Sequence, residues 1–311
     1  MTQFHPPDST ALKDKVVVLT GGALGVGAAL VRLLHALGAH VFFGDVLDQP
    51  AFALEKELSA SGRTHVKFVH CDVTSYSDNL ALFDAAYETC GRIDHAVAVA
   101  GLGEQGSFIS PNLTLESVRE EPKRAMSVVD INLKGPLYFS RLASVYLRQP
   151  GLKDKSSTDA ADKSLTLVAS VAGFREDPGL FVYTPSKHGV LGILRAFRSA
   201  LSQSKPHPIR TNAICPWMTR TRLVAGLEDV WAQHDLPANE PEDVAKMIVG
   251  VLADTKLIGE TLYVEGGRGW LIEQKIRSLM PQWLGEKQTR DLDKGTEIMG
   301  GGEGWTVGQE K

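Results

Sequence analysis

The sequence predicts an α/β fold in which a doubly wound, parallel sheet carries helices on both faces. Short β-branched or apolar runs alternate along the chain with stretches of helical length and pattern, as in successive strand–helix units. A glycine-rich turn joins the first run to the first helical stretch, and polar or tight-turn residues follow several later runs. The 311 residues are 43% hydrophobic and 23% charged, as in an ordinary soluble globular protein.

The first strand–helix unit predicts a dinucleotide-binding turn. A strand is expected at Val16–Leu19, followed by the turn Thr20–Gly27 and a helix that Gly38 ends. Glycine permits the tight turn and the close approach of a pyrophosphate, and the helix N-terminus offers free N–H groups to the anion. A glycine pattern alone would be weak, but its place between a strand and a helix makes it specific. The cofactor-binding residues expected here are Gly21, Leu24, Gly25, Val26 and Gly27.

The second strand, His40–Gly44, ends in Asp45 and indicates which dinucleotide is bound. An acid at this position suits the ribose hydroxyls of NAD and repels the extra phosphate of NADP. No Lys or Arg lies in Gly22–Leu24 or just after Asp45 to receive that phosphate. We therefore expect NAD rather than NADP; the alternative is an ordinary strand-end acid in solvent.

The later strands place further candidates at the same edge of the sheet. They are expected at Val66–His70, Ile93–Ala100, Leu165–Ala169, Ile209–Ile214 and Thr261–Val264. Ligands of such a sheet bind outside the carboxyl ends of the strands. The residues that follow strands at this edge include Asp72, Val73, Ala100, Gly101 and Ser170, and the segment with Pro216, Thr219 and Thr221.

Tyr183 and Lys187 form a candidate acid–base pair. If Tyr183–Gln203 is helical, the two side chains lie one turn apart on the same face. A lysine ammonium lowers the pKa of a neighbouring phenol, which can then exchange protons near neutral pH. Ser170 can add a hydroxyl from a strand end. The alternative is a tyrosine packed on the sheet and a lysine in solvent.

The segment Pro122–Arg148 is expected to form one long helix that contains Asn132. The pair Gly135-Pro136 within it should kink the helix or free backbone groups nearby. An asparagine at such a kink can hold a water molecule. The alternative is a plain polar residue on a helix.

Taken together, these motifs resemble the short-chain dehydrogenase/reductase family. They are Thr20-Gly21-x-x-x-Gly25-x-Gly27, Asp72-Val73, Ala100-Gly101, Asn132, Ser170, Tyr183-x-x-x-Lys187, Pro216 with Thr221, and Val264-Glu265-Gly266-Gly267. The resemblance covers roughly Leu12–Gly267 and implies a Rossmann fold with a seven-stranded parallel sheet. It also implies a homodimer or homotetramer built on two long helices.

The same resemblance implies the roles of the site residues. The catalytic tetrad is Asn132, Ser170, Tyr183 and Lys187; Tyr183 and Lys187 also contact the cofactor, as do Pro216, Thr219 and Thr221. Two positions depart from the family pattern. Val99 replaces an asparagine that steadies the central strand, and Trp217 replaces a glycine that follows the sixth strand.

We therefore expect reversible hydride transfer between NAD and a secondary alcohol or ketone, with Tyr183 as general acid and base. An apolar and aromatic wall predicts a bulky hydrophobic substrate, steroid-like or a secondary-metabolite alcohol. That wall is expected from Leu102, Phe174, Pro178, Trp217, Met218, Leu223 and Trp231. The alternatives are a family member recruited for cyclase or isomerase chemistry and a dinucleotide-binding protein without turnover.

The rest of the chain divides into a flexible arm (1–11), one domain (12–267) with a lid at about 217–240, and a C-terminal extension (268–311). The extension could cover the site, mediate assembly or be partly disordered, and the polar segment 151–163 is expected to be a surface loop. The net charge of −4 gives no case for nucleic acid or an anionic membrane. No apolar run approaches a membrane span, and we expect no signal peptide, no metal site and a cytoplasmic location.

Overall fold

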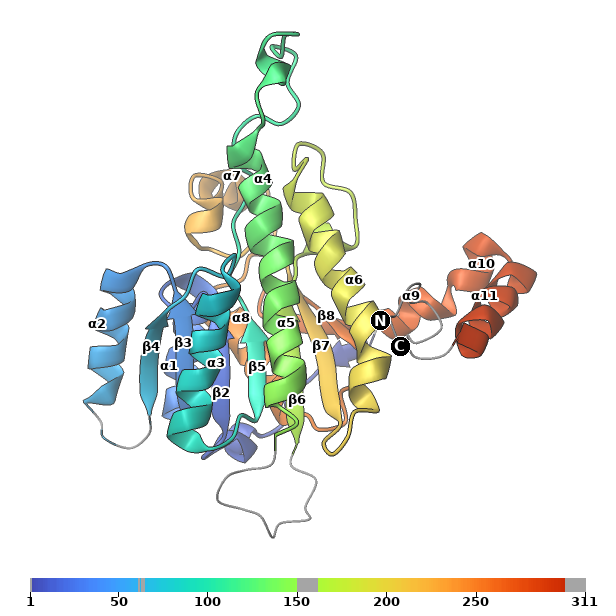
Figure 1. Cartoon of the computed structure of the whole chain (residues 1–311). Helices are drawn as coiled ribbons and strands as arrows, with labels where there is room; N and C mark the ends of the chain where they lie inside the picture. Colours follow the sequence, from blue (N-terminus) through green and yellow to red (C-terminus); the bar gives the residue numbers. More distant parts are fainter. Residues whose placement is uncertain (1, 61, 63–64, 150–161, 300–311) are drawn as a thin grey trace, which may run out of the picture.

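A sheet with strand order β1-β9-β8-β7-β6-β5-β2-β3-β4 runs through the molecule (Figure 1). The computed structural model describes residues 2–60, 62, 65–149 and 162–299. The strands are β1 (Thr2–Phe4), β2 (Val16–Thr20), β3 (His40–Asp45), β4 (Val66–His70), β5 (His95–Ala98), β6 (Lys163–Val168), β7 (Ile209–Pro216), β8 (Thr261–Glu265) and β9 (Arg268–Leu271). Strands β2 to β8 are parallel, which confirms the expected seven-stranded core; β9 and β1 add two antiparallel strands at one edge.

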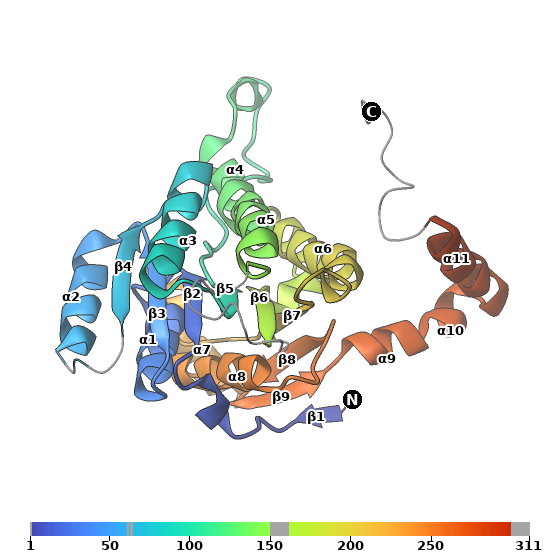
Figure 2. The ribbon, with the colours of Figure 1, turned by 60° about the horizontal axis from the view of Figure 1, so that its bottom comes forward.

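Two layers of helices cover the sheet, as the alternating pattern predicts (Figure 2). One face carries α1 (Gly25–Ala36), α2 (Asp48–Ser59) and α8 (Pro241–Ala253), whose apolar residues share one core with the sheet. The other face carries α3 (Tyr76–Cys90), α5 (Gly135–Tyr146) and α6 (Tyr183–Ser202), which share a second core. Because both faces are covered, β2 is buried along its whole length.

The register brings the carboxyl ends of the central strands to one level. Thr20 at the end of β2 lies beside Gly44 of β3 on one side and Ala98 of β5 on the other. Val168 at the end of β6 lies beside Ile214 of β7. The turns that follow these strands therefore meet along one edge of the sheet, where the site is built.

The expected long helix is interrupted at the predicted place. It consists of α4 (Lys123–Val129), a π-helical turn η3 (Asp130–Lys134) and α5. Pro136 has no N–H, and its ring crowds the carbonyl four residues earlier, so the regular ladder widens before it. Asn132 lies in the π-helical turn.

The N-terminal arm was expected to be flexible over residues 1–11, but its described part, from Thr2 on, is held in place. β1 pairs with β9, with Thr2 opposite Leu271, and the helical turn η1 (Ser9–Leu12) follows it. Phe4 is buried, and it lies with Pro6 against Gly250 of α8, where a β-carbon would come within 3.1 Å of the Phe4 ring. The missing side chain at Gly250 thus provides the space in which the arm packs.

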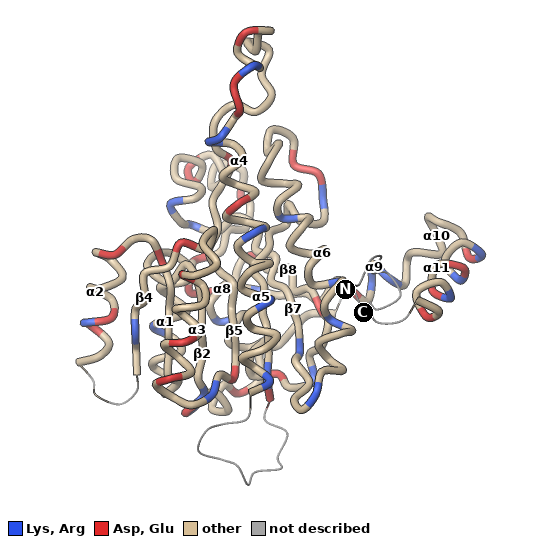
Figure 3. The backbone as a smooth tube through the Cα atoms, viewed as in Figure 1, with Lys and Arg blue, Asp and Glu red and all other residues tan. Residues whose placement is uncertain are grey.

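The C-terminal extension begins inside the sheet, because Arg268–Leu271 forms β9. The helices α9 (Glu273–Ser278), α10 (Met280–Leu284) and α11 (Glu286–Met299) then project away from the body (Figures 1 and 2). Glu273 ties α9 to α6 through Arg195 and Arg198. Acidic and basic residues are mixed along α11 (Figure 3). Lys287–Asp291 and Glu286–Arg290 form ion pairs there.

The expected loop at 151–163 falls mostly outside the described residues. Its last residue, Lys163, is not in a loop: it is the first residue of β6 and is buried. No helix in the described part of the chain combines the length and apolar character that a membrane crossing requires.

Candidate active site

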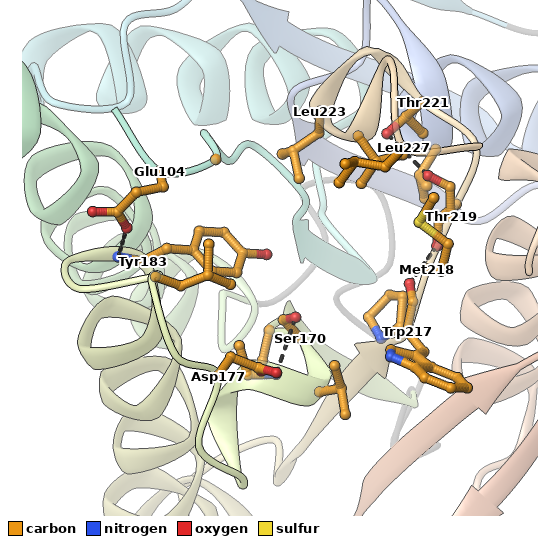
Figure 4. Close-up of a pocket in the computed structure, with 18 of the residues that line it drawn as sticks. Glu104, Ser170, Asp177, Tyr183, Trp217, Met218, Thr219, Thr221, Leu223 and Leu227 are labelled. Carbon is orange, nitrogen blue, oxygen red and sulfur yellow. Dashed lines mark hydrogen bonds between the residues drawn. The ribbon is translucent and has the colours of Figure 1, made fainter. Parts of the chain in front are cut away.

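A cavity of about 350 Å³ lies at the edge of the sheet where the parallel strands end (Figure 4). Ser170, directly after β6, and Tyr183, the first residue of α6, lie on one side of it. Trp217 and Met218, after β7, lie on the opposite side. The described residues that line it also include Val26, Glu104, Asp177, Leu180, Pro216, Thr219, Thr221, Leu223, Val224, Leu227 and Trp231. Ser170 and Tyr183, two of the four expected catalytic residues, therefore share one space with part of the expected apolar wall.

Tyr183 and Ser170 interact directly. Burial raises the pKa of the Tyr183 phenol above its ordinary value, and a hydrogen bond from the Ser170 hydroxyl acts in the opposite direction. Ser170 is fixed because its Oγ accepts a hydrogen bond from the Ala172 N–H at 3.2 Å, in the turn η4 (Val171–Gly173). A substrate oxygen in the cavity can thus meet two hydroxyl groups from different elements.

Lys187 lies one turn after Tyr183 on α6, as the spacing predicts. Its Nζ is 5.7 Å from the centre of the Tyr183 ring and donates a hydrogen bond to the Val168 carbonyl at 3.1 Å. Burial lowers the pKa of Lys187 to about 8. At Tyr183 burial is the largest effect, and the net direction of its pKa is upward.

Asn132 fastens two segments together. Its Oδ1 accepts from the Leu102 N–H at 2.7 Å, and its Nδ2 donates to the Leu102 carbonyl at 2.8 Å and to Ser186 Oγ at 3.2 Å. Both amide hydrogens are therefore used, and only Oδ1 can accept one more hydrogen bond. Asn132 can therefore bind the expected water molecule only through Oδ1.

The glycine turn leaves space for a ligand backbone at the N-terminus of α1. Gly21 has φ +72°, and a β-carbon there would lie 2.7 Å from Ala100. A β-carbon on Gly27 would lie 1.8 Å from the Gly21 carbonyl oxygen, so the turn and the helix can approach only with glycine at both positions. Gly25 faces Thr221 across the entrance, and a β-carbon there would come 3.2 Å from the Thr221 methyl group.

Asp45 lies beside this turn. Its carboxylate accepts from the Ala23 N–H at 2.9 Å and from the Leu47 N–H at 3.0 Å, so the acid has a fixed position at the end of β3. Leu24 precedes α1 and is partly exposed.

The remaining cofactor candidates lie along the same edge. Asp72 Oδ1 accepts from the Thr74 N–H at 2.9 Å, whereas Val73 is buried against Gly135. Beyond them, the Ala100 N–H lies 3.4 Å from Thr20 Oγ1, and an added β-carbon on Gly101 would come 3.3 Å from Lys187 Nζ. The structure thus brings the predicted residues together, from the glycine turn to the end of β7.

Comparison with known proteins identifies the family. The profile of the short chain dehydrogenases matches residues 15–230, more than half of the chain. The protein belongs to the short-chain dehydrogenase/reductase family. It is 34% identical over 278 residues to short-chain dehydrogenase/reductase ascJ of Acremonium egyptiacum, covering 89% of this chain and 87% of that protein. Membership makes it an oxidoreductase that acts on alcohol groups with a nicotinamide dinucleotide.

Other relatives and solved structures agree with this assignment. The chain is 33% identical to 5'-hydroxyaverantin dehydrogenase of Dothistroma septosporum, covering 71% of this chain and 72% of that one. The crystal structure of gox2181 superposes with a TM-score of 0.67 at 25% identity, over 83% of this chain and 97% of that one. The Rossmann-type fold predicted from the sequence is thereby confirmed.

Trp217, where the family has a glycine, forms part of the cavity wall in this short-chain dehydrogenase. Its ring stands edge-on to Trp231 of α7 (Glu228–Gln233), with centroids 5.1 Å apart, and Trp231 Nε1 donates to the Pro237 carbonyl at 3.0 Å. The contact between Trp217 and Trp231 therefore joins the end of β7 to the segment predicted as a lid.

Of the seven residues predicted for the substrate wall, Trp217, Met218, Leu223 and Trp231 line the cavity. Leu102, Phe174 and Pro178 do not line the cavity, and Phe174 packs on Tyr263 instead, with centroids 5.9 Å apart. Leu180, Val224 and Leu227 line it without having been predicted. Val224, in the turn η5 (Arg222–Val224), and Leu227 both lie within the segment predicted as a lid.

Proposed function

We propose that this dehydrogenase transfers hydride reversibly between NAD and a secondary alcohol or ketone that is bulky, hydrophobic and not anionic. The observation that carries the proposal is the placement of Tyr183 and Ser170, hydrogen-bonded to each other, inside a cavity with tryptophan and leucine walls. Bound NAD supplies the hydride chemistry, and the protein supplies orientation and proton transfer.

Tyr183 exchanges the proton in this proposal. In the oxidative direction the Tyr183 phenolate takes the proton of the substrate hydroxyl as hydride leaves the carbinol carbon. In reduction the phenol returns the proton to the carbonyl oxygen. Ser170 donates a hydrogen bond to the same oxygen, and its contact with Tyr183 opposes the effect of burial on the pKa of the phenol.

Lys187 and Asn132 support the proton path. Lys187 holds the ribose hydroxyls and connects the phenol to solvent. The missing side chain of Gly101 leaves room beside Lys187 Nζ and Asn132 Oδ1, because an added β-carbon would lie 3.3 Å and 3.5 Å from them. A water molecule at this place completes the proposed relay, using the one acceptor position that Asn132 retains.

The preference for NAD rests on Asp45. Its carboxylate is held beside the glycine turn by Ala23 and Leu47, and the residues Gly22 to Leu24 carry no positive charge. A carboxylate at the end of β3 accepts hydrogen bonds from ribose hydroxyls and repels a 2′-phosphate. At the other end of the cavity, Pro216, Thr219 and Thr221 orient the nicotinamide.

The charge of the cavity supports an uncharged or cationic substrate. Its described lining contains the carboxylates Glu104 and Asp177 and no lysine, arginine or histidine. A substrate carboxylate would be repelled and left without a partner. Relatives named 5'-hydroxyaverantin dehydrogenase and chanoclavine-I dehydrogenase support dehydrogenation over the cyclase and sensor alternatives.

The test combines cofactor binding with turnover. The purified protein is titrated with NADH and with NADPH by fluorescence, and consumption of NADH is then followed with a panel of hydrophobic ketones. We expect tight binding of NADH, weak binding of NADPH and oxidation of NADH that depends on a ketone. Tight binding without turnover on any ketone or alcohol would overturn the proposal in favour of non-redox chemistry.

Tyr183→Phe tests the proton transfer within the same assay. Loss of the phenolic oxygen should lower turnover by roughly two to four orders of magnitude while the affinity for NADH stays close to that of the wild type. Unchanged turnover would contradict the role of Tyr183.

The proposal extends to assembly in the cytoplasm as a homodimer or homotetramer. The long helix α5 exposes Leu137 and Val145, apolar residues that a second copy would cover. Light scattering after size-exclusion chromatography measures the mass directly, and a monomer at micromolar concentration would contradict this part.

A further inference from the structure

Glu104 lies at the wall of the cavity and is bonded to the start of the helix that carries Tyr183. Its carboxylate accepts from the Val182 N–H, with both oxygens at 3.1 Å, and from the Tyr183 N–H at 2.7 Å. Figure 4 shows the carboxylate pointing at the backbone of this turn. The structure thus uses Glu104 as a cap for this helix.

The first turn of α6 depends on this cap. The Thr184 N–H bonds to the Leu180 carbonyl and the Ser186 N–H to the Val182 carbonyl, both at 3.1 Å, and Pro185 has no N–H. The Val182 and Tyr183 N–H groups remain, and no local side chain caps them. Glu104, 78 and 79 residues earlier in the chain, satisfies both.

The charge of Glu104 suits this position. A helix N-terminus carries a partial positive charge that a carboxylate stabilises. The first turn of α6 contains no acidic residue of its own. Glu104 therefore supplies from another segment the acid that the helix lacks locally.

The contact closes a ring of hydrogen bonds around the catalytic groups. Asn132 holds both the N–H and the carbonyl of Leu102, two residues before Glu104. Asn132 Nδ2 also donates to Ser186 Oγ, whose hydroxyl donates to the Tyr183 carbonyl at 2.6 Å. The segment after β5 is thus fixed at two points, Leu102 and Glu104.

We propose that Glu104 is a positioning residue for Tyr183: by holding the backbone at the start of α6, it sets the phenol at the height of Ser170. This inference rests on the proposed function, because it assigns Glu104 a part in the same proton transfer. A displacement of about 1 Å in a reacting group costs on the order of 100-fold in rate.

The substitutions Glu104→Ala and Glu104→Gln test the role. Glu104→Ala should lower kcat roughly 10- to 100-fold while the dissociation constant for NADH stays unchanged. The midpoint of the kcat–pH profile for alcohol oxidation should move to higher pH, since misalignment weakens the hydrogen bond from Ser170 that favours the phenolate. Glu104→Gln keeps an acceptor oxygen and should recover most of the lost turnover.

Glu120→Ala is the matched control. Glu120 is an exposed acid in the loop between β5 and α4, and its removal should leave kcat and the pH profile unchanged. Amide hydrogen exchange gives a second measurement that needs no turnover. Exchange at Val182 and Tyr183 should be faster in Glu104→Ala than in the wild type.

The outcomes separate the two proposals. If the wild type oxidises no alcohol with either dinucleotide, the proposed function fails, and exchange at Val182 and Tyr183 still shows whether Glu104 holds the helix. If the wild type turns over and Glu104→Ala matches it in kcat and pH profile, the inference about Glu104 alone is overturned. Exchange at Val182 and Tyr183 that is unchanged in Glu104→Ala overturns it in either case.

Discussion

Two lysine side chains are buried near opposite ends of strand β6, and they differ in whether a carboxylate lies beside the ammonium group. Lys163 begins the strand, where its Nζ lies 2.9 Å from Asp94 Oδ1 and 2.6 Å from the Ile93 carbonyl. Lys187 of α6 lies at the other end and donates to the carbonyl of Val168, the last residue of the strand, at 3.1 Å. Lys187 forms no ion pair with the described residues.

The difference separates a charge kept for stability from one kept for chemistry. Burial lowers the pKa of both lysines, and at Lys163 the Asp94 carboxylate opposes this effect. A buried charge without a counter-ion destabilises the fold. Such a charge is retained where a reaction needs it, which is the role that we propose for Lys187 beside Tyr183 and not for Lys163.

The largest expected effect is on turnover. Lys187→Met should lower kcat by about three orders of magnitude, since proton transfer and ribose binding both lose a partner. Lys163→Met should leave kcat per folded molecule within about threefold of the wild type, because the end of the strand that it occupies lies away from the cavity. Steady-state assays corrected for the folded fraction by circular dichroism make the measurement. Equal losses would remove the distinction between the two lysines.

The second largest expected effect is on the stability of the fold, at the start of β6, where Lys163 is paired with Asp94. Lys163→Met leaves the Asp94 carboxylate buried without its partner and should reduce the free energy of unfolding by about 3–5 kcal/mol. Urea denaturation measures this change. The double variant Lys163→Met/Asp94→Leu removes both charges and should recover most of the loss; a double variant as unstable as the single one would show that packing, rather than charge, dominates.

Lys187→Met should change the free energy of unfolding in the opposite direction, toward higher stability. The wild-type ammonium is buried at pH 7 without a carboxylate, and its pKa of about 8 lies below the unfolded value near 10.4. Removing it should raise the free energy of unfolding by about 3 kcal/mol. Between pH 8 and about 10.4 the folded lysine is neutral while the unfolded one is still charged, so the free energy of unfolding of the wild type rises with pH. The gap between the free energies of unfolding of Lys187→Met and the wild type should therefore narrow over this range. A gap that widens over this range would contradict the lowered pKa.

The smallest expected effect is on the stability of the fold at acidic pH. Burial raises the pKa of Asp94, but Lys163 and the Val16 N–H outweigh this and lower it to about 2. A carboxylate with a depressed pKa contributes stability that is present above the unfolded value near 3.9 and is lost as pH falls through about 2. The wild type should lose about 2 kcal/mol between pH 4 and pH 2, and Asp94→Asn should show a flatter profile in the same denaturation series.

The two lysines also show what the sequence could and could not predict. Tyr183 and Lys187 lie four residues apart on one helix, so local spacing was enough to pair them. Lys163 was assigned to a polar loop, because its partner Asp94 is 69 residues away and nothing near it signals burial. Glu104 was missed for the same reason.

The same distinction applies to the fold. The parallel strands and their helices carry local patterns, and they were found. Strand β1 was taken for a loose arm because its partner β9 and the notch at Gly250 lie far along the chain.

The pairing of β1 with β9 has a consequence for how the chain is made. Thr2 pairs with Leu271, so the whole parallel core lies between the two strands in the sequence. The parallel core can form while synthesis continues, whereas the antiparallel edge cannot close until β9 has been made. Closure of this edge therefore reports that translation has passed Leu271. A chain stopped before β9 would leave the edge of β8 unpaired and open to association with other chains.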